Sequence, residues 1–277
     1  ALARRKEAPL PALRKLLASP SLRDRLGACE ALAKLRGKAA PAIPELRKAL
    51  KDEDLWLRIR AAEALAAIGN PAMDSVPELL EMIAQGPSKE DPRGMEQRFL
   101  CFTIFGQMLK RSLEGVNREQ LRSAVVAGLK NEDGRARGSA SGIYRQLGYE
   151  EIKPLLPAIH EAIVTPSPSG IMFAGGVRLA GVEILAQHRI REGIPLCLQV
   201  MEIDKWGKRD RIKRGLKALA RYGAAAKPIL PALHELEKNL QAHREARNLK
   251  GEIEQVSTLI QEIESASDTV ELRSLED

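Results

Sequence analysis

Residues 58–69 read RIRAAEALAAIG and carry the pattern that decides the fold. Apolar residues recur along this stretch at steps of three and four, which is the spacing of one face of an α-helix. Its last residue, Gly69, belongs to the type that most readily ends a helix in the left-handed conformation. Weaker copies of the stretch occupy residues 25–37, 137–148, 178–187 and 212–223. This repetition predicts stacked helical units rather than one large core.

A second short pattern, an apolar residue followed by proline, precedes these stretches and marks the start of a partner helix. Proline is tolerated there because the N–H groups of the first helical turn have no helical partner to lose. Its copies begin at Leu10, Ile43, Val76, Leu156, Ile194 and Leu230. When the segment around Ser123 is added as a further copy, the steps between copies are 33 to 46 residues. The spacing predicts about six helical hairpins followed by a C-terminal helical cap.

Together the two patterns resemble the HEAT-repeat family, especially its PBS-lyase-like branch, over roughly residues 8–236. The resemblance implies an all-α fold, a right-handed α-α superhelix of the armadillo-like type. It also implies a ladder of arginines and aspartates between neighbouring repeats, with Arg25, Arg58, Arg137 and Arg178 as its arginines. The third hairpin, around residues 98–102, departs from the family: by the repeat alignment it has no arginine at the expected ladder position, and it carries unusual aromatic bulk. We expect a solenoid at residues 1–236 and, in the same domain, a capping helix and tail at residues 237–277.

Local signals predict where the helices of each hairpin pack closely and where they begin and end. Small residues take one equivalent place in the second helices and allow a neighbouring helix to approach closely: Ala28, Ala61, Ala140, Gly181 and Gly215. We expect the second helices to end on left-handed glycines, namely Gly37, Gly69, Gly148 and Gly223. Acceptors for helix N-caps are predicted within residues 52–54 and 131–133.

Two hairpins carry long internal loops, at residues 85–96 and 165–176. Long loops on a rigid scaffold often carry function. The second loop has an apolar tip, Ile171, Met172 and Phe173, flanked by glycines. Two interpretations stay open: the tip packs back into the core, or it contacts a partner or a neighbouring domain. The lysine and hydroxyl residue that complete a phosphate-binding loop do not follow its glycines.

The net charge of +7 is unevenly distributed. Residues 1–38 carry +7 and residues 205–217 carry +6, whereas residues 235–277 carry −6. Within and just after the second basic stretch, four cations recur at helical spacing beside the aromatic residue Trp206: Arg211, Arg214, Lys217 and Arg221. One interpretation is a phosphate-binding face on which Trp206 stacks a nucleic-acid base. The other is a solvated face that pairs with the acidic C-terminal helix.

The sequence offers little to an enzyme hypothesis. The three cysteines are widely spaced inside helical patterns and are expected to be small buried hydrophobes. The pairs His160-Glu161 and His234-Glu235 invite comparison with deoxyhypusine hydroxylase, which resembles this fold and binds two irons through such pairs. Only two pairs are present here, two repeats apart and on first helices. We therefore predict no catalytic residue, no metal site and no cofactor.

These observations favour a non-enzymatic protein-binding or scaffold module that forms part of a larger protein. Its partner is expected to be a protein or another domain of the same polypeptide. The alternative is a nucleic-acid-binding solenoid that uses the face at residues 205–221. No apolar run is long enough to predict insertion into a membrane. No targeting signal is present from which a compartment could be predicted, and residues 265–277 are expected to form a frayed or extended tail.

Overall fold

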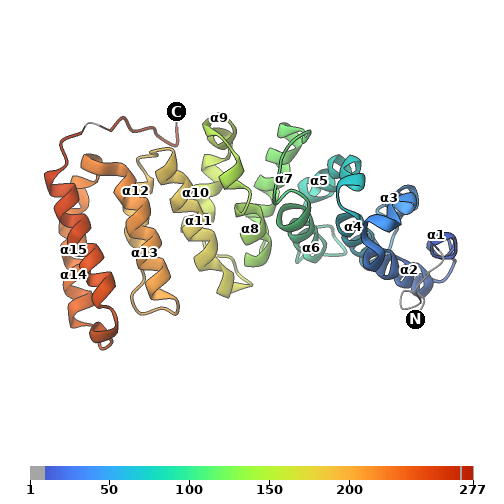
Figure 1. Ribbon diagram of the computed structural model, residues 1–277, viewed down its shortest axis with the longest axis horizontal. Coiled ribbons are helices and arrows are strands. Elements are labelled where there is room, and N and C mark those ends of the chain that lie inside the picture. The colour runs from blue at the N-terminus through green and yellow to red at the C-terminus, as the bar shows by residue number, and fades with distance from the viewer. Residues whose placement is uncertain (1–9, 269, 277) are drawn as a thin grey trace. The chain divides into compact units, whose positions relative to one another are not determined.

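The computed structural model describes residues 10–268 and 270–276, and its regular structure in this part of the chain is helical (Figure 1). One isolated bridge, between Ile190 and Arg273, is the only β-type pairing in the described residues. The expected all-α solenoid of helical hairpins is confirmed. The chain divides into two compact units, residues 1–146 and 147–277, each considered by itself below. The boundary that we expected after residue 236 falls inside a helix (Leu230–Ala242) and stays a proposal.

The first unit contains four helical hairpins arranged in two layers (Figure 1). One layer holds the first helix of each hairpin: α1 (Leu10–Leu17), α3 (Ile43–Ala49), α5 (Val76–Gln85) and α7 (Arg118–Lys130). The other holds the second helices: α2 (Leu22–Leu35), α4 (Leu55–Ile68), α6 (Met95–Thr103) and α8 (Gly134–Ser141). Each second helix packs on the next, α2 on α4, α4 on α6 and α6 on α8. The core of this unit therefore lies between the layers and is continuous along the stack.

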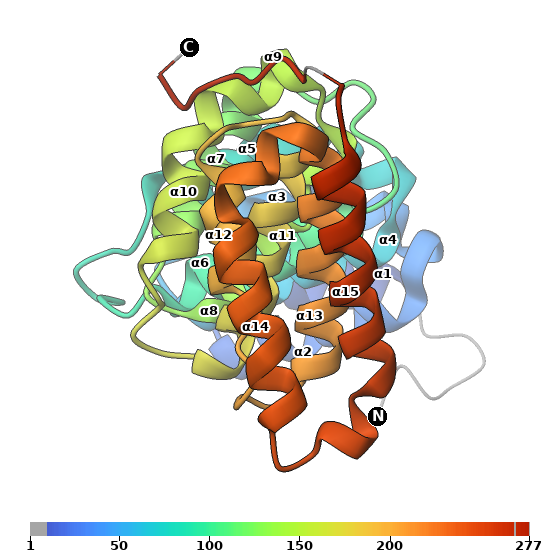
Figure 2. The same cartoon turned by 90° about the vertical axis from the view of Figure 1, so that its left-hand side faces the viewer.

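The second unit contains three hairpins and a short leading helix, α9 (Tyr149–Ile152). Its hairpins pair α10 (Leu156–Val164) with α11 (Ala174–Gln187), α12 (Gly193–Gln199) with α13 (Lys208–Leu219), and α14 (Leu230–Ala242) with α15 (Lys250–Ser265). The predicted capping helix is α15, which packs on both α14 and α13 (Figure 2). No helix in the described part of the chain combines the length and the apolarity needed to cross a bilayer.

The predicted N-caps close the second helices of two hairpins. Asp54 accepts a hydrogen bond from the backbone N–H of Leu57 at 2.8 Å, and Asp133 accepts one from the N–H of Arg135 at 2.8 Å. Both carboxylates sit at the positive end of a helix and satisfy donors that have no partner within it.

The glycine prediction holds in part at two positions and is wrong at two. Gly69 and Gly223 have positive φ angles of 82° and 49°, which side chains disfavour, but their ψ angles of −139° and −131° lie outside the left-handed helical region. Gly69 ends α4, whereas Gly223 lies in the 3₁₀ segment after α13. Gly37 does not take a positive φ, because α2 ends one residue earlier than expected and Arg36, with φ of 52°, takes it instead. Gly148 is extended, with φ of −77°, because it precedes the short helix α9 rather than ending α8.

Small residues at the predicted places allow close packing between helices. Ala28, Ala61 and Ala140 are fully buried in the first unit. In the second unit, a Cβ atom at Gly181 would lie 2.4 Å from Cγ1 of Ile163, and one at Gly215 would lie 2.6 Å from Cγ of Met201. The two glycines let α11 approach α10 and α13 approach the end of α12.

We expect Gly181→Val to lower the free energy of unfolding by about 1–3 kcal/mol, because the added side chain has no room beside Ile163. Gly176→Ala in the same helix is the matched control. No atom lies within 4 Å of a Cβ at that position, and alanine has a higher helix propensity than glycine. The substitution should therefore raise the free energy of unfolding by up to about 1 kcal/mol. Urea unfolding of both variants checks this, and equal effects would contradict the packing described.

Candidate interaction surface

An arginine occupies the fourth position of the second helix in most hairpins and ties its hairpin to the next one. In the second hairpin, Arg58 donates to the backbone carbonyls of Asp52 and Glu53 at 2.8 and 2.9 Å, in the turn that leads into its own helix. Its other guanidinium nitrogens bind both carboxylate oxygens of Glu96 in the third hairpin, at 2.6 and 2.8 Å. This pairing raises the pKa of Arg58, mainly through the hydrogen bonds to Glu96. Arg58 therefore stabilises the turn before α4 and also binds the next hairpin.

The other predicted ladder arginines make related contacts. Arg25 donates to the carbonyls of Ser19 and Pro20 and lies 3.4 Å from Asp52 of the next hairpin. Arg137 donates to the carbonyl of Asn131 at 2.8 Å. Arg178, in the second unit, lies 3.2 Å from Glu202 of the following hairpin and donates to the carbonyl of Gln199.

Two arginines that we had not placed in this ladder occupy the same helix position. Arg98, in α6, lies 3.3 Å from Asp133 of the next hairpin, so the expectation that the third hairpin lacks such an arginine is wrong. The long loop before α6 displaces this residue from the regular repeat spacing, and the sequence pattern therefore missed it. Arg211, in α13, pairs with Glu202 at 2.5 Å and donates to the carbonyl of Trp206.

Glu202 is the point at which two hairpins of the second unit meet. Its Oε2 atom receives Nη1 of Arg178 from α11 and Nη1 of Arg211 from α13. The guanidinium of Arg211 also packs on Gly175 in the first turn of α11, where a Cβ atom would lie 2.5 Å from Nη2. One carboxylate thus connects the N-terminal end of α11 with the loop that leads into α13.

The apolar tip of the loop at residues 165–176 projects from this region. The side chains of Ile171, Met172 and Phe173 are 72%, 86% and 41% exposed, so the interpretation that they plug the core is wrong. Trp206, on the neighbouring loop, is 96% exposed. Both loops lie at the lower end of the second unit's helices in Figure 1. We call these four residues the apolar edge.

The predicted basic stripe is not a single free face. Arg214 binds both carboxylate oxygens of Glu183 in α11, at 2.6 and 2.9 Å. Arg211 is engaged by Glu202, as described above. Arg221 lies beyond the end of α13, and only it and Lys217 are exposed among these four cations. Pairing with the C-terminal hairpin occurs through two other residues, Lys208 with Glu245 at 2.9 Å and Arg209 with Glu252 at 3.9 Å.

The first unit carries an aromatic cluster on its second helices. The ring of Trp56 in α4 meets the ring of Phe99 in α6 edge to face, with centroids 5.9 Å apart. The guanidinium of Arg98 lies 4.7 Å from the centre of the Phe99 ring. Phe102, one helical turn further on, is 57% exposed. The aromatic bulk noted in the sequence therefore lies partly at the surface.

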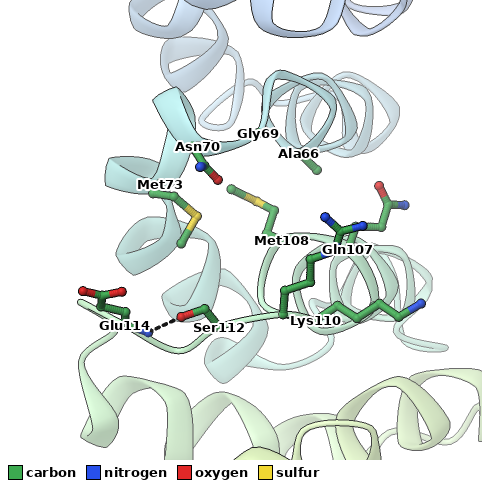
Figure 3. Close-up of a pocket in the computed structure, with 11 residues that line it drawn as sticks. Ala66, Gly69, Asn70, Met73, Gln107, Met108, Lys110, Ser112 and Glu114 are labelled. Atoms are coloured by element: carbon green, nitrogen blue, oxygen red, sulfur yellow. Dashed lines mark hydrogen bonds between the residues drawn. The ribbon is translucent and has the colours of Figure 1, made fainter.

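A pocket of about 540 Å³ opens in the first unit (Figure 3). It lies between the end of α4 with its following turn and a π-helical segment, Ile104–Met108, with the loop after it. The side chains of Met73 and Met108 point toward each other across it, and Lys110, Arg111 and Glu114 line its rim. Residues 106–114 of its lining lie outside the two repeated patterns, so the repeats do not predict this pocket.

The described residues bring together no cluster of three or more histidine, cysteine or acidic side chains that could hold a metal. His160 and His234 lie in α10 and α14, both first helices, as predicted. Burial raises the pKa of the Cys29 and Cys197 thiols to about 12, so neither is a ready nucleophile at neutral pH.

We expect Arg58→Ala to lower the free energy of unfolding by about 2–3 kcal/mol, because it removes four charge-assisted hydrogen bonds at a partly buried site. Arg60→Ala is the control, since Arg60 pairs with Glu63 on the exposed side of the same helix and should cost less than about 0.5 kcal/mol. A double-mutant cycle with Glu96→Ala measures the direct coupling, which should reach about 1 kcal/mol or more. A coupling near zero would show that the pair does not join the two hairpins.

Comparison with known proteins supports the architecture and goes no further. The model of the HEAT-repeat family matches residues 10–94, which comprise α1 to α5 and the loop after α5. No curated protein matches the chain. The matched segment contains Arg25 and Arg58 with the turns that they hold. Residues 10–94 are therefore identified as HEAT repeats.

Proposed function

We propose that this chain is a non-enzymatic protein-binding module and that the apolar edge of its second unit contacts the partner. HEAT repeats generally mediate protein interactions or scaffolding. The observation that carries the proposal is the exposure of Trp206 and Met172, at 96% and 86%, on two loops joined through Glu202. A large exposed apolar patch marks an interaction site, and we propose that these two loops form one.

The apolar edge has the composition of a binding hot spot. Full burial of a side chain such as Ile171 or Met172 contributes about 1.5–3 kcal/mol, and tryptophan is enriched among the residues that dominate binding energy. The ion pairs at Glu202 connect α11 and α13, the helices that follow the two loops, and we propose that they order the edge so that less entropy is lost when the partner binds. A fixed apolar surface of this kind suits a folded partner or another domain of the same polypeptide.

Charges around the edge indicate the character of the partner. Exposed cations outnumber exposed acids near the edge and on the neighbouring loop between α14 and α15. The cations are Lys205, Arg209, Arg244, Arg247 and Lys250, and the acids are Asp204 and Asp210. A partner with apolar side chains surrounded by carboxylates complements this surface and is steered toward it. The nucleic-acid alternative gains no support, because Arg211 and Arg214 of the predicted stripe are held by carboxylates.

The proposal is tested by placing a photo-crosslinking amino acid at Met172 or at Trp206 in cells. We expect both positions to capture the same protein, or the same second domain, because the two side chains belong to one surface. Lys217 serves as the control position, since it is exposed in the same unit but lies away from the loop edge on α13. Capture of nucleic acid at Lys217, without protein capture at Met172 and Trp206, would overturn the proposal in favour of the alternative.

We expect Met172→Asp combined with Trp206→Asp to abolish capture of that partner while the melting temperature stays within a few degrees of the unsubstituted chain. Exposed side chains contribute little to folding, generally less than about 0.5 kcal/mol each. Phe102→Asp, which changes an exposed aromatic side chain of the other unit, should leave capture unchanged. Retention of binding by the double variant would show that the partner contacts a different surface.

A further inference from the structure

The C-terminal tail is docked on the second unit rather than frayed. α15 ends at the opposite end of the helices from the apolar edge, and the tail runs along that end to the neighbourhood of α9 (Figures 1 and 2). Residues 272–275 lie there beside residues 188–192, the turn between α11 and α12. The expectation of an extended tail is correct, and that of a frayed one is wrong for these residues.

Backbone pairing holds the centre of this segment. The N–H of Arg273 donates to the carbonyl of Arg189 at 3.0 Å, and the N–H of Arg191 donates to the carbonyl of Arg273 at 2.8 Å. These bonds form the isolated parallel bridge between Ile190 and Arg273. Arg189 adopts a φ of 57°, which is uncommon for residues other than glycine. This turn leaves the carbonyl of Arg189 and the N–H of Arg191 available to the backbone of Arg273. Such pairing recognises an extended backbone whatever its side chains.

Side chains add chemical selectivity to the docking. The guanidinium of Arg273 stacks on the ring of Tyr149, 3.8 Å from the ring centre. The Ser274 hydroxyl donates to Oε1 of Glu192 at 3.0 Å, and the N–H of Leu275 donates to Oε2 of the same carboxylate at 3.2 Å. His188 lies beside Tyr149, and burial together with nearby Arg273 lowers the pKa of its imidazole. A neutral imidazole does not repel the arginine.

We infer that Tyr149 and residues 188–192 form a binding site for an extended, arginine-bearing peptide, and that residues 272–275 of this chain are its built-in occupant. The site selects arginine because a planar guanidinium stacks on the Tyr149 ring while the backbone of the same residue pairs with the turn. Glu192 favours hydroxyl and backbone donors at the following two positions and excludes an acidic residue there. A peptide of this kind from another protein would displace the tail.

This inference is independent of the proposed function, because the site and the apolar edge lie at opposite ends of the helices of the second unit (Figure 1). The tail is tethered, so it competes with any added peptide at an effective concentration on the order of millimolar. The site is consequently masked in the unaltered chain. Its binding capacity has to be measured after the tail is released.

The test uses the full chain with Arg273→Ala, which removes the stacked guanidinium and so releases the tail from the site without shortening the chain. A fluorescent peptide with the sequence VELRSLE, residues 270–276, is titrated and followed by anisotropy. We expect it to bind the Arg273→Ala chain at least about tenfold more tightly than the unaltered chain, where the tail competes. Replacing the peptide's arginine by alanine, or adding Tyr149→Ala to the protein, should weaken this binding by a similar factor.

Hydrogen exchange at the Arg191 amide supplies a second readout. This amide should be protected in the unaltered chain, exchange faster in the Arg273→Ala chain and regain protection when the peptide is added, with the helical circular dichroism constant. Equal peptide binding to both chains, or binding that ignores the loss of Tyr149, would overturn the inference. Absence of binding to an Arg273→Ala chain with intact circular dichroism would overturn it as well.

Discussion

One carboxylate links the two helices whose preceding loops carry the apolar edge. Glu202 accepts hydrogen bonds from Arg178 of one hairpin and Arg211 of the next, and Arg211 also binds the carbonyl of Trp206. The same arrangement recurs in the first unit, where Arg58 holds its own turn and reaches Glu96 of the following hairpin. A hairpin cannot bury both of its apolar faces alone, so it is stable only when stacked on neighbours. Each arginine makes that stacking more specific. Its N–H donors can reach the turn of their own hairpin and a carboxylate of the next one only when the two hairpins are aligned in this way.

Much of the architecture could be predicted because the signals are local. Proline in the first turn, an N-capping aspartate such as Asp54, and a small residue such as Gly181 act within a few residues of their own helix or on the helix next to it. The ends of the helices were less predictable. Whether Arg36 or Gly37 takes the positive φ angle depends on the residue at which α2 stops, and the position of the glycine does not fix that residue.

The surfaces were harder to predict because they depend on distant pairs. Arg211 and Arg214 form a basic stripe in the sequence, yet Glu202 and Glu183 neutralise them from neighbouring elements. The tip at Ile171 is as apolar as a core residue, and only its placement shows that it is exposed. The partner of Arg273 is Tyr149, more than a hundred residues away, and no periodic pattern links the two. Helical periodicity predicts which residues are buried within a hairpin, but not which charges meet between hairpins.

Hydrogen exchange in a Glu202→Gln variant tests most directly whether this carboxylate orders the apolar edge. The substitution keeps the size of the side chain and removes the charge that two arginines share. The account predicts faster exchange at residues 203–207 and in the first turn of α11, with unchanged exchange in α14 and α15. Unchanged exchange at residues 203–207 and in the first turn of α11 would contradict it, because the two loops would then be ordered without Glu202.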